Sequence, residues 1–222
     1  MWMLLILLAN PAVNHPCPVK SAAVTQARLA AIAGAPAFDV RFTGEGDLAA
    51  AGALLGRRIQ DVGGRVDAIA VTDGTLQIKG YLPDAEKTLP QLAVPGRLSV
   101  HALVPGAAGA APTLEAAAIQ AEDFEVCAAA LAETPGLPAA INLTLTAGAR
   151  DRLAELTKTH LNQPLALVLD GRTVSSPVVK EAITGGRLQI SGAQLGDALV
   201  LQAVLRSGPL PVLTRVALAT VP

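Results

Sequence analysis

The side chains that could do chemistry in this sequence are few and widely spaced. His15, His101 and His160 lie far apart, so the sequence predicts no histidine cluster for catalysis or metal binding. His160 is better explained as a favourable partner of a helix C-terminus. Cys17 and Cys127 show no CxxC or Cys/His spacing and are expected to be unpaired, although an oxidising compartment would permit a disulfide between them. We therefore predict no metal site and no cofactor.

Three further clusters have the composition of functional sites but not the spacing. Ser175-Ser176 lack the GxSxG pattern of a nucleophile elbow. The stretch Thr184 to Arg187 lacks the GxxxxGKS/T pattern of a phosphate loop and precedes a strand, so a tight turn is the better interpretation. Glu122, Asp123 and Glu125 lack calcium-loop spacing and indicate a solvated turn or helix start. No catalytic residue is predicted, and we expect that the protein is not an enzyme.

The overall composition excludes several partners. With 51% hydrophobic but only 2% aromatic residues, the chain offers no stacking platform for bases or sugars. A formal net charge of -1 gives no basic surface for nucleic acid. Trp2 to Ala9 resemble the apolar stretch of a signal peptide but lack a preceding Lys or Arg, and they are shorter than the roughly 20 residues of a spanning helix. We expect a leader, an envelope location close to a membrane, and no spanning helix.

Strand-like and helical stretches alternate in the first half of the chain. The predicted strands span residues 38–42, 66–71, 76–82 and 98–104, and the predicted helices span residues 48–62 and 84–92. Asp47 is a helix N-cap, and Asp73-Gly74 is a dipeptide that suits a tight hairpin turn. Residues 105–112 are rich in Gly, Ala and Pro, a composition that indicates a subdomain boundary.

The second half shows the same alternation. The predicted strands span residues 141–145, 165–169, 172–179, 187–190 and 212–219. Of the predicted helices, one begins after Thr146, whose side chain is expected to cap it, and the other begins at about Gln194. Asp170-Gly171 predicts a hairpin turn, and Pro177 predicts that the returning strand lies at a sheet edge. The last strand could close the sheet of the first unit, which would make the second unit an insertion.

Four motifs follow one another in this second half. They are Leu167 to Gly171 with Val174 to Pro177, Ile183 to Gly186, Ile190 to Gly192, and Leu205 to Pro211. In order and spacing they resemble the head of the first periplasmic domain of SecD, the export subunit that works beside the SecYEG channel. Upstream, Arg57 to Ile59 with Gly63, Leu76 to Pro83, and Pro95 to Leu98 more loosely resemble the base of the same domain.

The resemblance implies an α+β fold with a ferredoxin-like split base and an inserted α+β head. It implies a leader and poorly ordered segment over residues 1–37, a base over 38–105 plus 211–220, and a head over 106–210. The sequence also departs from the family. Leu153 replaces an aromatic residue, and residues 112–138 have no clear counterpart. Because the sequence ends at Pro222, without the family's membrane helices, we expect that it cannot use a proton gradient.

The implied function is assistance to protein export by transient binding of unfolded secretory polypeptide, in the periplasm or at the outer face of the inner membrane. Sec translocon components are the other implied partners, and nucleic acid is not expected. The expected polypeptide-binding residues are Asp170, Gly171, Pro177, Gly185, Gly186 and Gly192, with Gly208 and Pro211 as structural motif residues. For each glycine and turn residue a purely structural role is the alternative. A non-catalytic structural or adaptor protein that binds a folded envelope partner is the alternative function.

Overall fold

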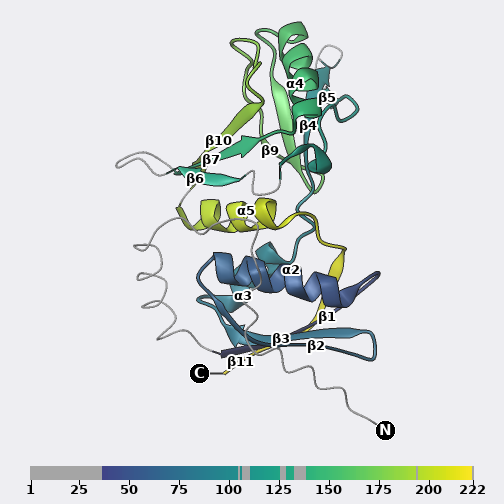
Figure 1. Cartoon of the computed structure of the whole chain (residues 1–222), viewed down its shortest axis with the longest axis vertical. Helices are drawn as coiled ribbons and strands as arrows, with labels where there is room; N and C mark the ends of the chain where they lie inside the picture. The colour runs from purple at the N-terminus through teal and green to yellow at the C-terminus, as the bar shows by residue number, and fades with distance from the viewer. Residues whose placement is uncertain are drawn as a thin grey trace. The chain divides into compact units, whose positions relative to one another are not determined.

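The computed structural model describes residues 37–104, 106, 111–125, 129–132, 139–193 and 195–221. The described chain divides into two compact units (Figure 1). Unit 1 comprises residues 37–95 and 199–221, and unit 2 comprises residues 96–198. The predicted leader and both cysteines lie outside the described residues.

Unit 1 is a four-stranded sheet with helices on one face (Figure 1). Its elements are β1 (Ala37–Gly44), α2 (Leu48–Asp61), β2 (Arg65–Thr72), β3 (Thr75–Tyr81), α3 (Ala85–Leu92), most of α5 (Leu195–Ser207) and β11 (Leu213–Val221). The strands are ordered β11-β1-β3-β2, and neighbours are antiparallel. The last strand therefore closes the sheet of the first unit, as the sequence predicts.

Local sequence explains the elements of unit 1. The Asp47 carboxylate accepts hydrogen bonds from the backbone N–H groups of Ala49 and Ala50 at 2.9 and 3.0 Å, which begins α2 by satisfying two free donors. Asp73 and Gly74 both have positive φ, at 49° and 70°, as the tight turn between β2 and β3 requires. Both predictions are confirmed.

The core of unit 1 consists of aliphatic side chains and two phenylalanines. Fully buried members are Phe38, Val40, Phe42, Leu55, Ile59, Leu76, Ile78, Leu89 and Leu92. Alternate residues of β1 and β3 point inward and the apolar stripe of α2 covers them, which is the pattern of a sheet buried on one face. Ala203 and Val204 of α5 also belong to this core.

Unit 2 contains two small sheets and a helix (Figure 1). Its elements are β4 (Leu98–Val104), β5 (Thr113–Leu114), η1 (Ala121–Asp123), β6 (Ala130–Ala132), β7 (Ala139–Thr144), α4 (Ala147–Thr159), β8 (Leu165–Leu169), β9 (Arg172–Ser175) and β10 (Arg187–Ala193). One sheet is ordered β5-β4-β8-β9 and the other β10-β7-β6. Val100, Leu145, Leu153, Leu165 and Val179 are among the side chains that form the core between α4 and these strands.

Every edge strand longer than three residues in the described chain carries an extra residue that interrupts its pairing. The extra residues are Val216 in β11, Asp67 in β2, Gly192 in β10 and Val174 in β9. Such β-bulges bend an edge strand and break the regular ladder.

The mixed α+β fold class is confirmed, and the ferredoxin-like description of the base stays a prediction. Two local predictions are wrong. The return strand predicted over residues 172–179 ends at Ser175, because a bulge at Val174 and the missing N–H of Pro177 interrupt the ladder. Thr146 stands at the N-cap of α4, but its side chain makes no capping hydrogen bond.

The two compact units have limits of their own, and the predicted limits of base and head stay a prediction. β4 falls in unit 2 because it pairs with β8. Most of α5 falls in unit 1 because Ala203 and Val204 pack into that core.

Candidate polypeptide-binding site

The turn between β8 and β9 is fixed to the start of β4 by one side chain. Asp170 and Gly171 have φ of 49° and 80°, so both occupy the left-handed region that Asp tolerates and Gly favours. The Asp170 carboxylate accepts hydrogen bonds from the backbone N–H groups of Gly96 and Arg97, both at 2.9 Å. Its own N–H donates to the Arg97 carbonyl at 3.0 Å. Asp170 therefore holds the hairpin in place, with both carboxylate oxygens already engaged.

Pro177 lies just beyond β9, beside the residues that lead into β8. Its carbonyl accepts a hydrogen bond from Leu165 N–H at 3.0 Å, and Val179 N–H donates to the backbone carbonyl of Gln163, also at 3.0 Å. Between these two bonds, Pro164 and Val178 face each other as an isolated antiparallel bridge. The segment thus continues the edge that β9 begins, although it is too irregular to count as a strand.

The paired glycines stand where the chain must turn closely. Gly186 has φ of 63°, its carbonyl accepts a hydrogen bond from Leu145 N–H at 2.9 Å, and an added Cβ would lie 2.9 Å from Cγ of Arg150. Gly185 has open space at its Cβ position. Gly192 is the bulge residue of β10. Gly186 therefore has a structural reason to be glycine, whereas Gly185 has none in the described contacts.

A buried threonine fastens the loop that precedes β10. Thr157 is fully buried, and its hydroxyl donates to the Leu153 carbonyl at 2.8 Å. The same oxygen accepts the Ile183 N–H at 2.9 Å. The Thr157 hydroxyl thus joins α4 to the loop that carries Gly185 and Gly186. No sequence pattern indicated this role of Thr157.

The largest fully buried side chain of the described residues is Arg58 in α2. Its guanidinium donates to the Ser207 hydroxyl and to the carbonyls of Leu92, Val94, Pro95 and Gly208, at 2.5 to 3.2 Å. Within unit 1 it joins α2 to the end of α3 and to the end of α5. A buried charge is tolerated only when its donors are satisfied in this way.

The two structural motif residues lie at this junction or just after it. Gly208 has φ of 82°, and its carbonyl is one of the Arg58 acceptors. Pro211 lies two residues before β11. Arg58 itself could have been found in the sequence, because it interrupts the apolar stripe of α2 between Leu55 and Val62, on the face that must be buried.

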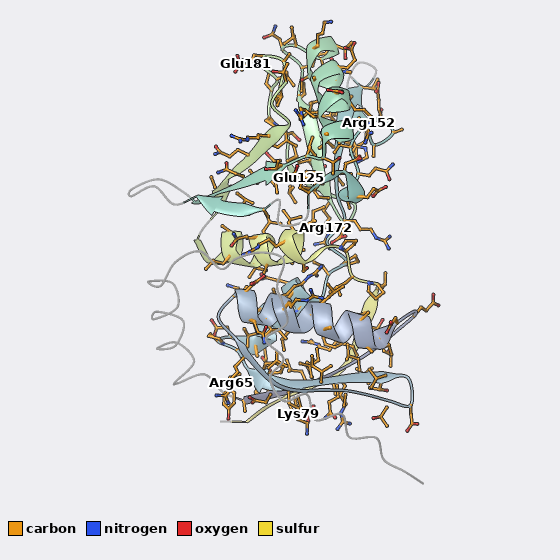
Figure 2. All side chains as sticks on the ribbon, in the orientation of Figure 1. Arg65, Lys79, Glu125, Arg152, Arg172 and Glu181 are labelled. Carbon is orange, nitrogen blue, oxygen red and sulfur yellow. The ribbon has the colours of Figure 1, made fainter. Side chains whose placement is uncertain are left out.

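The acidic cluster of unit 2 makes local hydrogen bonds. Asp123 accepts from Gln120 N–H at 2.9 Å and pairs with Arg152 of α4, which Figure 2 labels. Burial alone would raise the pKa of Asp123, but the hydrogen bond from Arg152 and the one from Gln120 outweigh it and lower that pKa. The cluster opens the short helix η1, as the sequence predicts.

The open face of the sheet in unit 1 carries a second polar network. Asp39 accepts two hydrogen bonds from the Gln77 amide at 2.7 and 2.9 Å and pairs with Lys79 at 3.3 Å. Arg65 pairs with Asp67 at 2.8 Å and stacks over the Tyr81 ring. Burial would raise the pKa of Asp39, but the hydrogen bonds from Gln77 and Lys79 and the nearby positive charges lower it. Figure 2 shows Arg65 and Lys79 on the side of the sheet away from α2.

Within the described ranges, no group of three or more His, Cys, Asp or Glu side chains could hold a metal ion. His101 and His160 are far apart in the chain and each bonds locally. The His101 ring contacts Ser99 Oγ and the Glu115 carbonyl, both at 2.8 Å, and the His160 ring contacts the Leu156 carbonyl of the last turn of α4 at 2.9 Å. In the same part of the chain, no helix combines the length and apolar character needed to cross a membrane.

The described chain is a two-unit α+β protein. Comparison with known proteins then gives a family match for part of the chain: residues 104–212 match the family described as "SecDF, P1 head subdomain". Two curated relatives support this assignment. The chain is 41% identical over 78 residues to the protein translocase subunit SecDF of Thermus thermophilus, covering 35% of this chain and 11% of that protein. It is 37% identical over 84 residues to SecD of Acidaminococcus fermentans, covering 37% and 20%.

Solved structures show the same fold. A structure titled "Structure and function of a membrane component SecDF that enhances protein export" aligns with a TM-score of 0.63 at 22% identity, covering 81% of this chain and 98% of that one. A crystal structure of SecDF in a super-membrane-facing form aligns with a TM-score of 0.67 at 19% identity, covering 89% and 34%. These findings confirm the predicted relationship to the first periplasmic domain of SecD. The relatives are translocase subunits, which do not form an enzyme family.

Proposed function

We propose that this chain is a SecD-like envelope module that assists protein export by transiently binding unfolded polypeptide. The matched stretches span only 11% and 20% of the two curated relatives, so the role of the whole translocase subunit is carried over here as part of the proposal. The corresponding location is the periplasm or the outer face of the inner membrane, and components of the Sec translocon are the expected neighbours.

The observation that carries this proposal is the β8–β9 hairpin of unit 2. It is the edge of a sheet, it lies inside the matched head, and Asp170 fixes its turn against β4. A strand edge that is already fixed by hydrogen bonds to a neighbouring strand can pair with an extended chain without losing conformational entropy of its own. In this proposal Gly171 and Pro177 shape the hairpin, and Gly185, Gly186 and Gly192 shape the neighbouring loop and strand.

A binding titration tests the proposal. The full 222-residue chain is titrated with a labelled secretory protein that is reduced and unfolded, and with the folded form of the same protein, and the anisotropy of the label is followed. Saturable binding of the unfolded form alone is the expected result. If neither form binds, or if both bind equally, the proposed function is wrong.

The adaptor alternative has its own supporting observation, the charged network on the open face of unit 1. Asp39, Lys79 and Arg65 lie on a rigid sheet, and fixed charges of this kind suit a folded partner with complementary charges. The salt dependence of binding to isolated envelope proteins tests this alternative. Affinity for a folded protein that falls as salt rises, and that is lost in Lys79→Glu, would favour the adaptor role.

A further inference from the structure

The backbone just after β9 offers hydrogen-bonding groups that point away from its own sheet. Leu165 N–H bonds to Pro177, and Val179 N–H bonds to Gln163. In an antiparallel arrangement alternate residues direct their N–H and C=O groups to the same side. The groups of Ser176 and Val178, which alternate with the bonded residues, therefore point outward.

These outward groups have no partner among the described residues. No backbone or side-chain hydrogen bond involves the N–H or C=O groups of Ser176 or Val178. Pro177 lacks an N–H, but its nitrogen faces the inner side, where Leu165 lies. The proline therefore leaves the outward donors at the two neighbouring positions intact.

Exposed apolar side chains lie on this hairpin and on the loop that pairs with its end. Val174, Val178 and Leu161 are 41%, 44% and 44% exposed. Leu161 lies in the loop between α4 and β8, which runs beside the segment after β9, because the next residue, Asn162, donates its N–H to the Val179 carbonyl at 2.8 Å. Free donors and acceptors beside exposed apolar side chains are what an added β-strand uses for affinity and selectivity.

We propose that residues 174–178 form the docking edge for an extended segment of unfolded polypeptide, which adds one short strand beside Ser176 and Val178. The inference rests on the proposed function and specifies its ligand. The ligand is a segment with apolar or β-branched residues at alternate positions and no proline opposite the outward groups. The bulge at Val174 limits the pairing to a few residues, so the complex is weak and reversible.

Backbone chemistry provides the first test. A seven-residue peptide of alternating Val and Thr is prepared in two N-methylated forms, one methylated at the odd positions and one at the even positions. An edge strand uses only every second N–H of its partner, so one form should bind as the unmodified peptide does and the other about fivefold more weakly or worse, the effect of losing one or more hydrogen bonds. Equal loss in both forms, or in neither, would overturn the proposal.

Variants locate the edge. Val178→Lys and Val174→Lys place charges among the exposed apolar side chains and should weaken binding of the unfolded client at least about threefold, while each variant keeps the melting temperature of the parent because the sites are exposed. Val216→Lys is the matched control, because Val216 is also the bulge residue of an edge strand and is 60% exposed, but it lies in unit 1. Loss of binding in Val216→Lys and not in the other two would place the edge elsewhere. If the parent binds no unfolded client at all, the proposed function fails first.

Discussion

The strongest prediction concerns the buried guanidinium of unit 1, and the change is Arg58→Met. Methionine keeps much of the volume and the helix propensity but donates no hydrogen bond. The variant removes the hydrogen bonds to Ser207, to Gly208 and to the carbonyls at residues 92, 94 and 95. Unit 1 should become much less stable, because α2 loses its polar connection to the ends of α3 and α5.

The size of the loss follows from these contacts. Five hydrogen bonds from a charged donor contribute about 1.5–3 kcal/mol each, or roughly 7–15 kcal/mol, and the desolvation of the guanidinium offsets several kcal/mol of this sum. The variant leaves several buried carbonyls without a donor, at about 1–3 kcal/mol for each one that stays unsatisfied, and we expect the free energy of unfolding to fall by about 3–5 kcal/mol. With a denaturant slope of about 2 kcal/mol/M, the urea midpoint of unit 1 should fall by roughly 1.5 M or more.

Urea unfolding followed by circular dichroism measures this loss, and hydrogen exchange with mass spectrometry assigns it to a unit. Faster exchange should appear in β1, α2 and β3 and not in α4 or β8. Arg57→Met is the matched control: Arg57 is one position away in the same helix and makes a single exposed hydrogen bond of 3.4 Å to Ala53. If Arg58→Met and Arg57→Met cost the same, or if Arg58→Met costs less than about 1 kcal/mol, the reasoning about the buried guanidinium is refuted.

Three further predictions concern single polar groups. Asp170→Asn keeps the left-handed conformation but accepts fewer backbone N–H groups, so the free energy of unfolding of unit 2 should fall by about 1 kcal/mol. An unchanged thermal melt would show that the hydrogen bonds from Gly96 and Arg97 contribute little to stability. Thr157→Val removes the acceptor of the Ile183 N–H and should cost about 1–2 kcal/mol, whereas Thr157→Ser should cost clearly less in the same melt. The pKa of Asp39 is lowered in the folded state from 3.8, so the ionised carboxylate stabilises the fold above pH 3.8, and this stabilisation is lost as the pH falls through the folded pKa. In Asp39→Asn the free energy of unfolding should therefore fall less steeply at acid pH than in the parent. The same slope in both proteins would contradict this.

The sequence was sufficient for the elements whose signals are local. The cap at Asp47 and the turns at Asp73-Gly74 and Asp170-Gly171 all depend on residues close in sequence. These patterns act before tertiary contacts form, so they can be interpreted without a structure.

Apart from the return of the last strand to the first sheet, which followed from the order of the predicted units, features that depend on contacts distant in sequence were not predicted. The partners of Arg58 lie 34 to 150 residues away, and no local pattern says which carbonyls will surround a guanidinium. Asp170 was predicted as a turn residue, but its hydrogen bonds to Gly96 and Arg97 cross more than 70 positions. The early end of β9 was missed because a bulge at Val174 depends on how β8 aligns with it.

The candidate site could be placed from the sequence only as a hairpin. Pro177 indicated a sheet edge, and the structure adds which backbone groups are already hydrogen-bonded there. Leu165 N–H donates to the Pro177 carbonyl, so the groups that point outward belong to Ser176 and Val178. The register between this segment and the residues before β8 decides which backbone N–H and C=O groups point outward. A shift of one residue would turn the outward groups inward and the inward groups outward.

The interrupted edge strands have a kinetic consequence. A foreign strand that aligns with β2, β9, β10 or β11 meets an extra residue after a short run of matched pairs, and beyond it the pattern of donors and acceptors no longer fits. Any such contact is therefore limited to a few hydrogen bonds of about 1 kcal/mol each and dissociates quickly. If the protein binds extended polypeptide as proposed, we expect the contact to be brief and repeated, and the same interruptions disfavour edge-to-edge pairing between copies of the chain.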